Sequence, residues 1–187
     1  MTTINSAAAC RLPRPSSFRS EYLSAAAPGL LWIRTAAVRD AEGLSAYFGA
    51  LSCPSRYNRF MGAVSNFSRV ARECLVHDRK ANRFTLVAEL REQSREIIIG
   101  EASYGFDRAA NCGEFAVSVS DQWQGRGLGS ALLGALQFRA ISLGHFELFG
   151  ETLKTNDRMK GLARRAGFAF SGSLDWRAVR FDKKLKA

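Results

Sequence analysis

The chain has 187 residues, of which 47% are apolar, so its length suits one domain with a tail and its composition excludes global disorder. No apolar run reaches the roughly 18 residues that a membrane-spanning helix needs, so we expect a soluble, cytoplasmic protein without a membrane partner. The net charge of +10 favours anionic partners such as a phosphate-rich cofactor or an acidic protein face. Nucleic acid is not expected, because no lysine/arginine block is long enough to mark a binding arm.

The cysteines and histidines argue against a metal site. Four cysteines lie far apart without a C-x-x-C pair, and only two histidines are present. A zinc site of the usual ligand spacing is therefore not expected, and we predict no metal cofactor. The thiols are interpreted as free and reduced, as in a cytoplasmic protein.

The first 28 residues are rich in Ala, Ser, Arg and Pro and contain a single acid, Glu21. A transit peptide has a similar composition, but no clear amphipathic helix is present. We therefore predict a poorly ordered extension over residues 1–28 and one domain over residues 29–187.

Helices dominate the next part of the chain. A short strand is predicted at 30–35, and Asp40 is expected to cap a helix over 41–51. The segment 52–55 contains a proline and is expected to break that helix. A longer helix is predicted over 58–76, because apolar residues recur there at spacings of three and four.

Three strands are predicted after these helices. Residues 84–90 and 96–106 flank the polar turn 91–94, as in a hairpin, and a third strand covers 114–120. Apolar side chains alternate with small or polar ones along the third strand. That pattern is typical of a strand that faces a cleft, but also of an ordinary surface strand.

Helices and strands alternate in the rest of the chain. A glycine-rich loop leads into a helix over 127–143, which is followed by a strand over 146–151 and a helix over 156–166. Two closing strands are predicted over 168–173 and 177–181. No internal repeat is present.

The glycine-rich loop is the first candidate site. Glycine stands at 125, 127 and 129, directly before a helix, and Arg126 adds a cation. A helix N-terminus offers unpaired N–H groups and about half a positive charge, so it binds phosphate, and glycine leaves room for the oxygens. The spacing is neither a dinucleotide-binding fingerprint nor a P-loop. A turn that is merely tightly packed is the alternative.

The loop and the order of elements together resemble the GNAT superfamily of N-acetyltransferases. The matching residues are Gln124, Gly127 and Gly129 in the loop, Asn156 at a later strand–helix junction, and Gly167 and Phe168 after the next helix. The resemblance covers about residues 30–182. The segments 121–129, 55–60 and 156–165 are also similar to the acetyltransferase domain of bacterial protein lysine acetyltransferases.

The resemblance implies an α+β (mixed α/β) fold, with a mixed, mostly antiparallel sheet of about seven strands flanked by about four helices. It places a V-shaped cleft between the fourth and fifth strands. The cofactor implied is acetyl-CoA, bound by a monomer or a homodimer. The residues implied to bind it are Val117, Val119, Gln124, Gly125, Arg126, Gly127, Leu128, Gly129, Ser130 and Asn156.

Some of these residues have a second interpretation. The side chains of Val117 and Val119 are also typical core residues, while their backbone groups would bind the pantetheine arm. Asn156 is equally a good helix N-cap. The basic residues Lys160, Arg164 and Arg165 would meet the 3′-phosphate or simply form a solvated helix face.

The implied reaction is direct attack of an amine on the acetyl thioester. A lysine-like amine has a pKa of about 10.4, so a base must remove its proton at neutral pH. Glu114 is the candidate base, because its position resembles that of the general-base glutamate of the protein acetyltransferases. A surface ion pair is the alternative for Glu114, and Glu101 and Glu151 are rival carboxylates.

The acceptor side is less defined. The resemblance places the acceptor wall at 55–60, where Tyr57 and Arg59 are the candidate substrate-binding residues. Many family members have a tyrosine seven residues after the motif asparagine, as the acid for the leaving thiolate, but this chain has Ala163. We expect an acetyltransferase acting on an amine, with a protein lysine as the first candidate. A small-molecule amine acetyltransferase and a non-catalytic acyl-CoA sensor are the alternatives.

Overall fold

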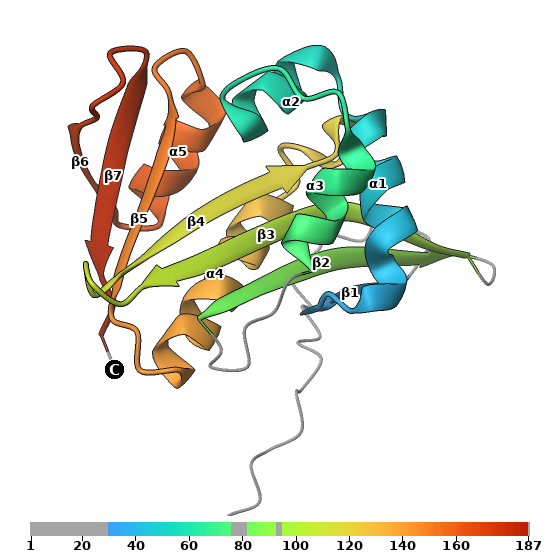
Figure 1. Ribbon diagram of the computed structural model, residues 1–187, viewed down its shortest axis with the longest axis horizontal. Coiled ribbons are helices and arrows are strands. Elements are labelled where there is room, and N and C mark those ends of the chain that lie inside the picture. Colours follow the sequence, from blue (N-terminus) through green and yellow to red (C-terminus); the bar gives the residue numbers. More distant parts are fainter. Residues whose placement is uncertain (1–29, 76–81, 93–94, 187) are drawn as a thin grey trace, which may run out of the picture.

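The computed structural model describes residues 30–75, 82–92 and 95–186. The predicted extension over 1–28 lies outside these residues. The described part forms one seven-stranded sheet with five α-helices packed on its two faces (Figure 1). The predicted α+β class with a mixed, mostly antiparallel sheet is confirmed.

The sheet has the strand order β1-β2-β3-β4-β5-β7-β6, and every neighbouring pair is antiparallel except β4 and β5. All predicted strands are found, with ends shifted by a few residues. The strands are β1 Leu30–Thr35, β2 Arg83–Glu92, β3 Arg95–Asp107, β4 Cys112–Val119, β5 Glu147–Leu153, β6 Ala169–Gly172 and β7 Ala178–Lys184.

The helices lie in two layers. The α-helices are α1 Ala41–Ala50, α2 Cys53–Phe60, α3 Phe67–Cys74, α4 Leu128–Ser142 and α5 Asp157–Arg165, with short 3-10 turns η1 Val38–Asp40 and η2 Asp121–Trp123. Apolar residues of α1 and α3 pack on one face of the sheet around Phe48 and Val87. Those of α4 and α5 pack on the other face, around Leu132 and Phe115.

The prediction of one helix over 58–76 is wrong. Ser52 caps α2, because its hydroxyl accepts a hydrogen bond from Ser55 N, and the proline at 54 stands in the first turn, where no N–H partner is needed. Met61 then takes a left-handed conformation with φ of 54° and ends α2. Asn66 caps the separate helix α3 by accepting from Arg69 N. Residue 76 lies outside the described residues.

Asp40 precedes α1 as predicted, but its side chain does not cap that helix. Its carboxylate accepts hydrogen bonds from Ala37 N and from the Arg34 guanidinium, which also contacts Glu89. Arg34 and the two carboxylates are largely buried. The Asp40 carboxylate therefore binds the Arg34 guanidinium instead of the first N–H groups of α1, because a charged donor gives the stronger hydrogen bond. The pKa of Asp40 is lowered, because these hydrogen bonds outweigh the effect of burial, which would raise it.

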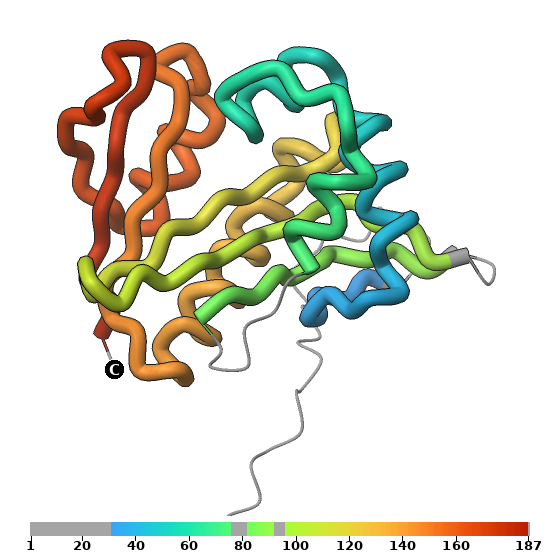
Figure 2. Tube along the Cα trace, in the orientation of Figure 1, coloured from blue at the N-terminus to red at the C-terminus, as the bar shows by residue number. Residues whose placement is uncertain are grey.

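The parallel strands β4 and β5 meet only at one end. They pair at Gly113 with Leu148 and at Glu114 with Phe149, and then separate (Figure 2). The predicted V-shaped opening between the fourth and fifth strands is therefore present, with Glu114 at its apex. Across the described ranges, no helix is long and apolar enough to cross a membrane.

Candidate functional site

A cleft of about 800 Å³ occupies the opening between β4 and β5. One wall is β4 from Phe115 to Val119, and the other is formed by the end of β5 and by α5. The glycine loop and α2 border the same cleft. The volume lies within the range of ligand pockets, about 300–1,000 Å³.

The glycine loop borders the cleft directly before α4. Gly125 and Gly127 have φ of 76° and 86°, a left-handed conformation that other residues adopt only with strain. A Cβ atom built on either glycine meets nothing within 4 Å, so the space in front of the loop is open. Gly127 is the N-cap of α4, so the first N–H groups of this 15-residue helix have no partner within the helix.

The backbone of β4 has one free side along the cleft. Ser120 N donates to Ile99 O of β3, so alternate residues of β4 point their backbone groups toward β3. By the same alternation, those of Val117 and Val119 point toward the open side. The Val119 carbonyl accepts a hydrogen bond of 2.9 Å from Gln124 Nε2. The side chains of both valines pack against the core, while binding of the pantetheine arm by their backbone groups stays a prediction.

The other predicted cofactor residues differ in position. Gly129 and Ser130 line the cleft. Arg126 is exposed, with its guanidinium 5.1 Å from the ring centre of Trp123, and does not line the cleft. The Leu128 side chain is buried in the core at 1% exposure. Leu128 therefore has only its backbone N–H to offer a ligand.

Asn156 lines the cleft and caps α5. Its Oδ1 accepts from Met159 N at 3.1 Å, and its Nδ2 donates to Thr152 Oγ1 at 2.9 Å. The N-cap interpretation is therefore confirmed, and a contact with the pantetheine arm stays a prediction.

Two arginines of α5 line the cleft, namely Arg158 and Arg165. They are seven residues apart and so share one face of the helix. Arg158 Nη1 donates to Gln124 Oε1. Lys160 instead pairs with Asp157, and Arg164 lies over the ring of Phe170. Sequence reasoning missed Arg158, for which only the seven-residue spacing to Arg165 was a signal.

The candidate base Glu114 lies at the apex of the cleft. It is exposed and is the last residue of β4 that pairs with β5. Its side chain points to the same face of the sheet as those of Ala116 and Ser118, because side chains two residues apart share a face. Ala116 and Ser118 line the cleft. Glu114, two residues before Ala116 along β4, is not among the residues that line it. The rival Glu151 lines the opposite wall.

The other rival, Glu101, is fully buried and ion-paired. It accepts from Arg59 Nε at 2.6 Å and from Ser118 Oγ at 2.8 Å, and the Tyr47 hydroxyl is 2.9 Å from Ser118 Oγ. Burial and the nearby Glu101 charge raise the pKa of Tyr47. Burial would lower the pKa of Arg59, but Glu101 raises it overall, so the guanidinium stays charged. The ion-pair interpretation of Glu101 is therefore the one that the structure bears out.

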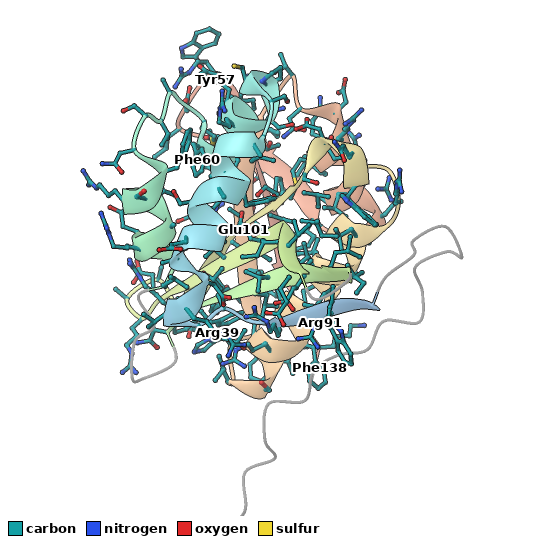
Figure 3. All side chains as sticks on the ribbon, turned by 90° about the vertical axis from the view of Figure 1, so that its right-hand side faces the viewer. Arg39, Tyr57, Phe60, Arg91, Glu101 and Phe138 are labelled. Atoms are coloured by element: carbon teal, nitrogen blue, oxygen red, sulfur yellow. The ribbon has the colours of Figure 1, made fainter. Side chains whose placement is uncertain are left out.

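Arg59 lines the cleft, but its guanidinium is directed at Glu101 and Ser103 beneath it. Tyr57 lies at the rim, 43% exposed, and does not line the cleft. Figure 3 shows this separation, with Glu101 near the middle of the molecule and Tyr57 at its upper edge. Tyr57 also interacts with Arg177, whose pKa is raised first by Asp175 and further by Tyr57.

Comparison with known proteins identifies the family of this chain. The model of the acetyltransferase (GNAT) family matches residues 52–168, which include α2, the cleft strands, the glycine loop and α5. The chain belongs to this family. Members of the GNAT family use acetyl-CoA, which agrees with a cleft that has a glycine loop at a helix N-terminus.

Curated relatives of this GNAT chain include the L-methionine sulfoximine/L-methionine sulfone acetyltransferases of Pseudomonas aeruginosa and Pseudomonas paraeruginosa. Each is 35% identical over 92 residues, which make up 47% of this chain and 54% of the relative. The chain thus spans about half the length of the curated relatives it matches.

Similar solved structures share the GNAT fold. The GNAT domain of S. lividans PAT superimposes with a TM-score of 0.74 at 23% identity, over 90% of this chain and 99% of that domain. The ribosomal-protein-S5-alanine acetyltransferase of Vibrio fischeri gives a TM-score of 0.71 at 14% identity, over 90% of this chain and 96% of that chain. At these identities the likeness concerns the fold.

Ala163 is where this GNAT chain departs from the tyrosine of many members. Its methyl group is fully buried in the core beside α4, so no proton donor reaches the cleft from this position. Within the described ranges, no cluster of three metal-ligating side chains is found.

Proposed function

We propose that this protein is an acetyl-CoA-dependent N-acetyltransferase that acts on an acceptor amine. One observation carries the proposal: the cleft opens where β4 leaves β5, with a glycine loop on one border and carboxylates at its apex and wall. The glycine loop fits a pyrophosphate, because two left-handed glycines leave open space before a helix N-terminus. Arg158 and Arg165 supply cations on the facing helix.

The proposal assigns a role to each group of residues around the cleft. Acetyl-CoA supplies the acetyl thioester that the amine attacks. The unpaired N–H groups at the start of α4, together with Ser130, hold the phosphates, and backbone groups of Val117 and Val119 hold the amide-rich arm. The N–H of Val117 also stabilises the charge that develops on the thioester oxygen. Glu114 accepts the proton of the acceptor amine, directly or through a water.

The leaving thiolate has no tyrosine to protonate it, because Ala163 replaces that residue. A thiol has a pKa of about 8.5, so its thiolate is a fair leaving group near neutral pH. Water therefore suffices as the proton source in this proposal.

We propose a protein lysine as the acceptor. The β6–β7 loop carries Leu174 and Trp176, which are 107% and 80% exposed. An Asp175-centred turn orders this loop, since Arg177 N and the Arg177 guanidinium both donate to its carboxylate. Arg177 in turn meets Tyr57 of α2 at the cleft rim. Large apolar side chains beside a catalytic cleft suit contact with a polypeptide, because aromatic residues are enriched at interfaces.

A small amine is the second candidate acceptor. It is favoured by the 35% identity to acetyltransferases for L-methionine sulfoximine and sulfone. An acceptor panel separates the two candidates: release of CoA is measured with lysine-containing proteins, their peptides and small amines, amino-acid analogues included. Turnover with polypeptides alone supports the lysine proposal. Tight binding of acetyl-CoA without turnover on any acceptor would instead indicate a non-catalytic acyl-CoA sensor.

The role of Glu114 is tested by Glu114→Gln. We expect kcat/KM at pH 7 to fall by about 10²–10⁴-fold, because the amide cannot accept the proton, while acetyl-CoA still binds. Part of the activity should return at high pH, where the amine loses its proton unaided. The readout is CoA release as a function of pH with the best acceptor of the panel.

Glu147→Gln is the matched control for Glu114→Gln. Glu147 is a glutamate of β5 that lies outside the cleft, with Lys184 at 3.5 Å as its partner, so its loss should not change turnover. Full activity of Glu114→Gln would remove Glu114 as the base, and Glu151 would be the next carboxylate to replace.

The cytoplasmic location and the monomeric or homodimeric state stay predictions.

A further inference from the structure

Asp121 lies between the two halves of the cleft. It begins η2, three residues before Gln124 of the glycine loop, and its side chain reaches the N-terminus of α2. Ser52 N donates to Oδ2 at 2.9 Å, and the hydroxyls of Ser52 and Ser55 donate to Oδ1 at 2.8 and 2.6 Å. The carboxylate thus binds three donors from a helix that is 66–69 residues away in sequence.

These contacts keep Asp121 ionised. Partial burial is the largest single effect and would raise its pKa. The hydrogen bonds from Ser55 and Ser52 outweigh burial and hold the pKa below its ordinary value. A charged acceptor with three short donors is stronger than a neutral one, so the attachment of α2 at this end is well defined.

The hydrogen bonds continue from α2 to the far wall of the cleft. Gln124 Nε2 donates to Ser55 Oγ at 3.2 Å, and Gln124 Oε1 accepts from Arg158 of α5. A continuous polar chain thus runs from Asp121 through Ser55 and Gln124 to Arg158. It borders the cofactor loop on one side and the proposed acceptor wall on the other.

We propose that Asp121 is a positioning residue that couples the two binding sites of the reaction, an inference that rests on the proposed function. It holds the start of α2, the acceptor wall, against the loop that binds the phosphates of acetyl-CoA. When phosphates fix that loop, Asp121 and Gln124 transmit the restraint to Ser52 and Ser55, and α2 becomes ordered for the acceptor. By linkage, the acceptor then strengthens acetyl-CoA binding by the same factor.

The coupling is measured by hydrogen–deuterium exchange of the full-length protein with and without CoA. In the wild type, saturating CoA should slow the exchange of amides in residues 52–60 by about fivefold. In Asp121→Ala, CoA should still bind, as calorimetry reports, but this protection of α2 should be lost. Asp121→Asn retains one acceptor oxygen and should show an intermediate effect.

A second set of measurements separates positioning from folding. Ser55→Ala removes one donor to Asp121 and also the acceptor of Gln124 Nε2. It should add little to Asp121→Ala, because both variants interrupt the same polar chain. With an acceptor found, Asp121→Ala should raise the KM for the acceptor more than the KM for acetyl-CoA. Asp107→Asn is the matched control, since Asp107 caps the turn after β3 and lies outside the cleft.

Three results overturn the proposal. Protection of α2 in Asp121→Ala equal to that in the wild type would show that Asp121 transmits nothing. Wild-type protein that binds CoA without any change in 52–60 would show that the sites are not coupled, and would leave the proposed function intact. A flat calorimetric trace for the wild type would overturn the proposed function and this inference together.

Discussion

The carboxylate of Glu101 has no access to solvent, yet it lies beside residues that line the cleft. Its charge is balanced by Arg59 and by the Ser118 hydroxyl, which come from α2 and β4. A buried charge is retained only when it is paired, so this cluster ties α2, the proposed acceptor wall, to the sheet. Glu101 therefore holds the Arg59 guanidinium in place, while the exposed Glu114 and the cleft-lining Glu151 remain the candidate carboxylates for contact with a substrate.

Replacing Arg59 by methionine should destabilise the protein strongly. The methionine fills similar space but leaves Glu101 as a buried charge without its ion-pair partner, which costs about 3–5 kcal/mol in comparable sites. The free energy of unfolding from urea denaturation measures the loss. In the double variant with Glu101→Gln the loss should be smaller than the sum of the two single losses.

Arg69→Met provides the comparison for Arg59→Met. Arg69 also pairs with a glutamate, Glu73, but on the exposed surface of α3, so its removal should leave stability unchanged. Equal effects of the two arginine substitutions would contradict a special role of burial at Glu101.

The helices show which elements can be predicted from residues that are close together in the sequence. Helix α4 lies between Gly127 and Gly144, both with positive φ, and was predicted within one residue. The single helix predicted over 58–76 joins the end of α2 to α3, because the apolar spacing continues across their junction. The break at Met61 depends on the packing of Phe60 against Phe48 and on the Arg59–Glu101 pair, which a window along the chain does not contain.

The N-terminus of α4 is tested by Gly127→Glu. The substitution strains the left-handed backbone and places a negative charge where the phosphates are proposed to bind. We expect acetyl-CoA affinity in calorimetry to fall by at least about a hundredfold, given loss of phosphate contacts and added repulsion. Gly127→Asn tolerates the left-handed conformation and should retain more affinity, which separates charge from strain.

Gly134→Glu is the control for Gly127→Glu on the same helix. Gly134 is exposed and a Cβ atom there meets nothing within 4 Å. The added charge is the same, but it lies away from the cleft, so affinity should not change. Unchanged affinity in Gly127→Glu would contradict the phosphate site.

At the scale of the whole molecule, an aromatic cluster packs β3 against the connection between α4 and β5. His145 stacks on Phe106 with 3.7 Å between ring centres, and its Nδ1 is 2.8 Å from the Tyr104 hydroxyl. Burial, followed by repulsion from Arg108, lowers the pKa of His145. The folded protein therefore binds this proton less readily than the unfolded chain does.

A pH dependence of stability follows from His145. The unfolded imidazole has a pKa of about 6.5, so the free energy of unfolding should decrease as the pH falls through that value and on to the lower folded pKa. In His145→Gln this part of the slope should disappear. Urea denaturation of both proteins between pH 7.5 and pH 5, about one unit or more to either side of 6.5, measures the difference. Parallel curves would show that His145 does not contribute.

The sequence by itself determined the order of the strands, the places of α1, α4 and α5 among them, and the glycine loop before α4. These features depend on residues that are neighbours in the chain: alternating apolar residues, a glycine with positive φ, a cap. The family motifs around Gln124 and Asn156 are local in the same sense. The family match over residues 52–168 agrees with the resemblance that these motifs carry.

Only the tertiary structure decided which side chains meet in the cleft. It directs Arg59 to Glu101, brings Ser52 and Ser55 to Asp121, and turns Arg158 rather than Lys160 toward the glycine loop. Each of these contacts joins elements that lie far apart in sequence, and each depends on where the sheet separates between β4 and β5. A charged residue has many possible partners along the chain, and the partner that it binds depends on the burial that folding imposes on both.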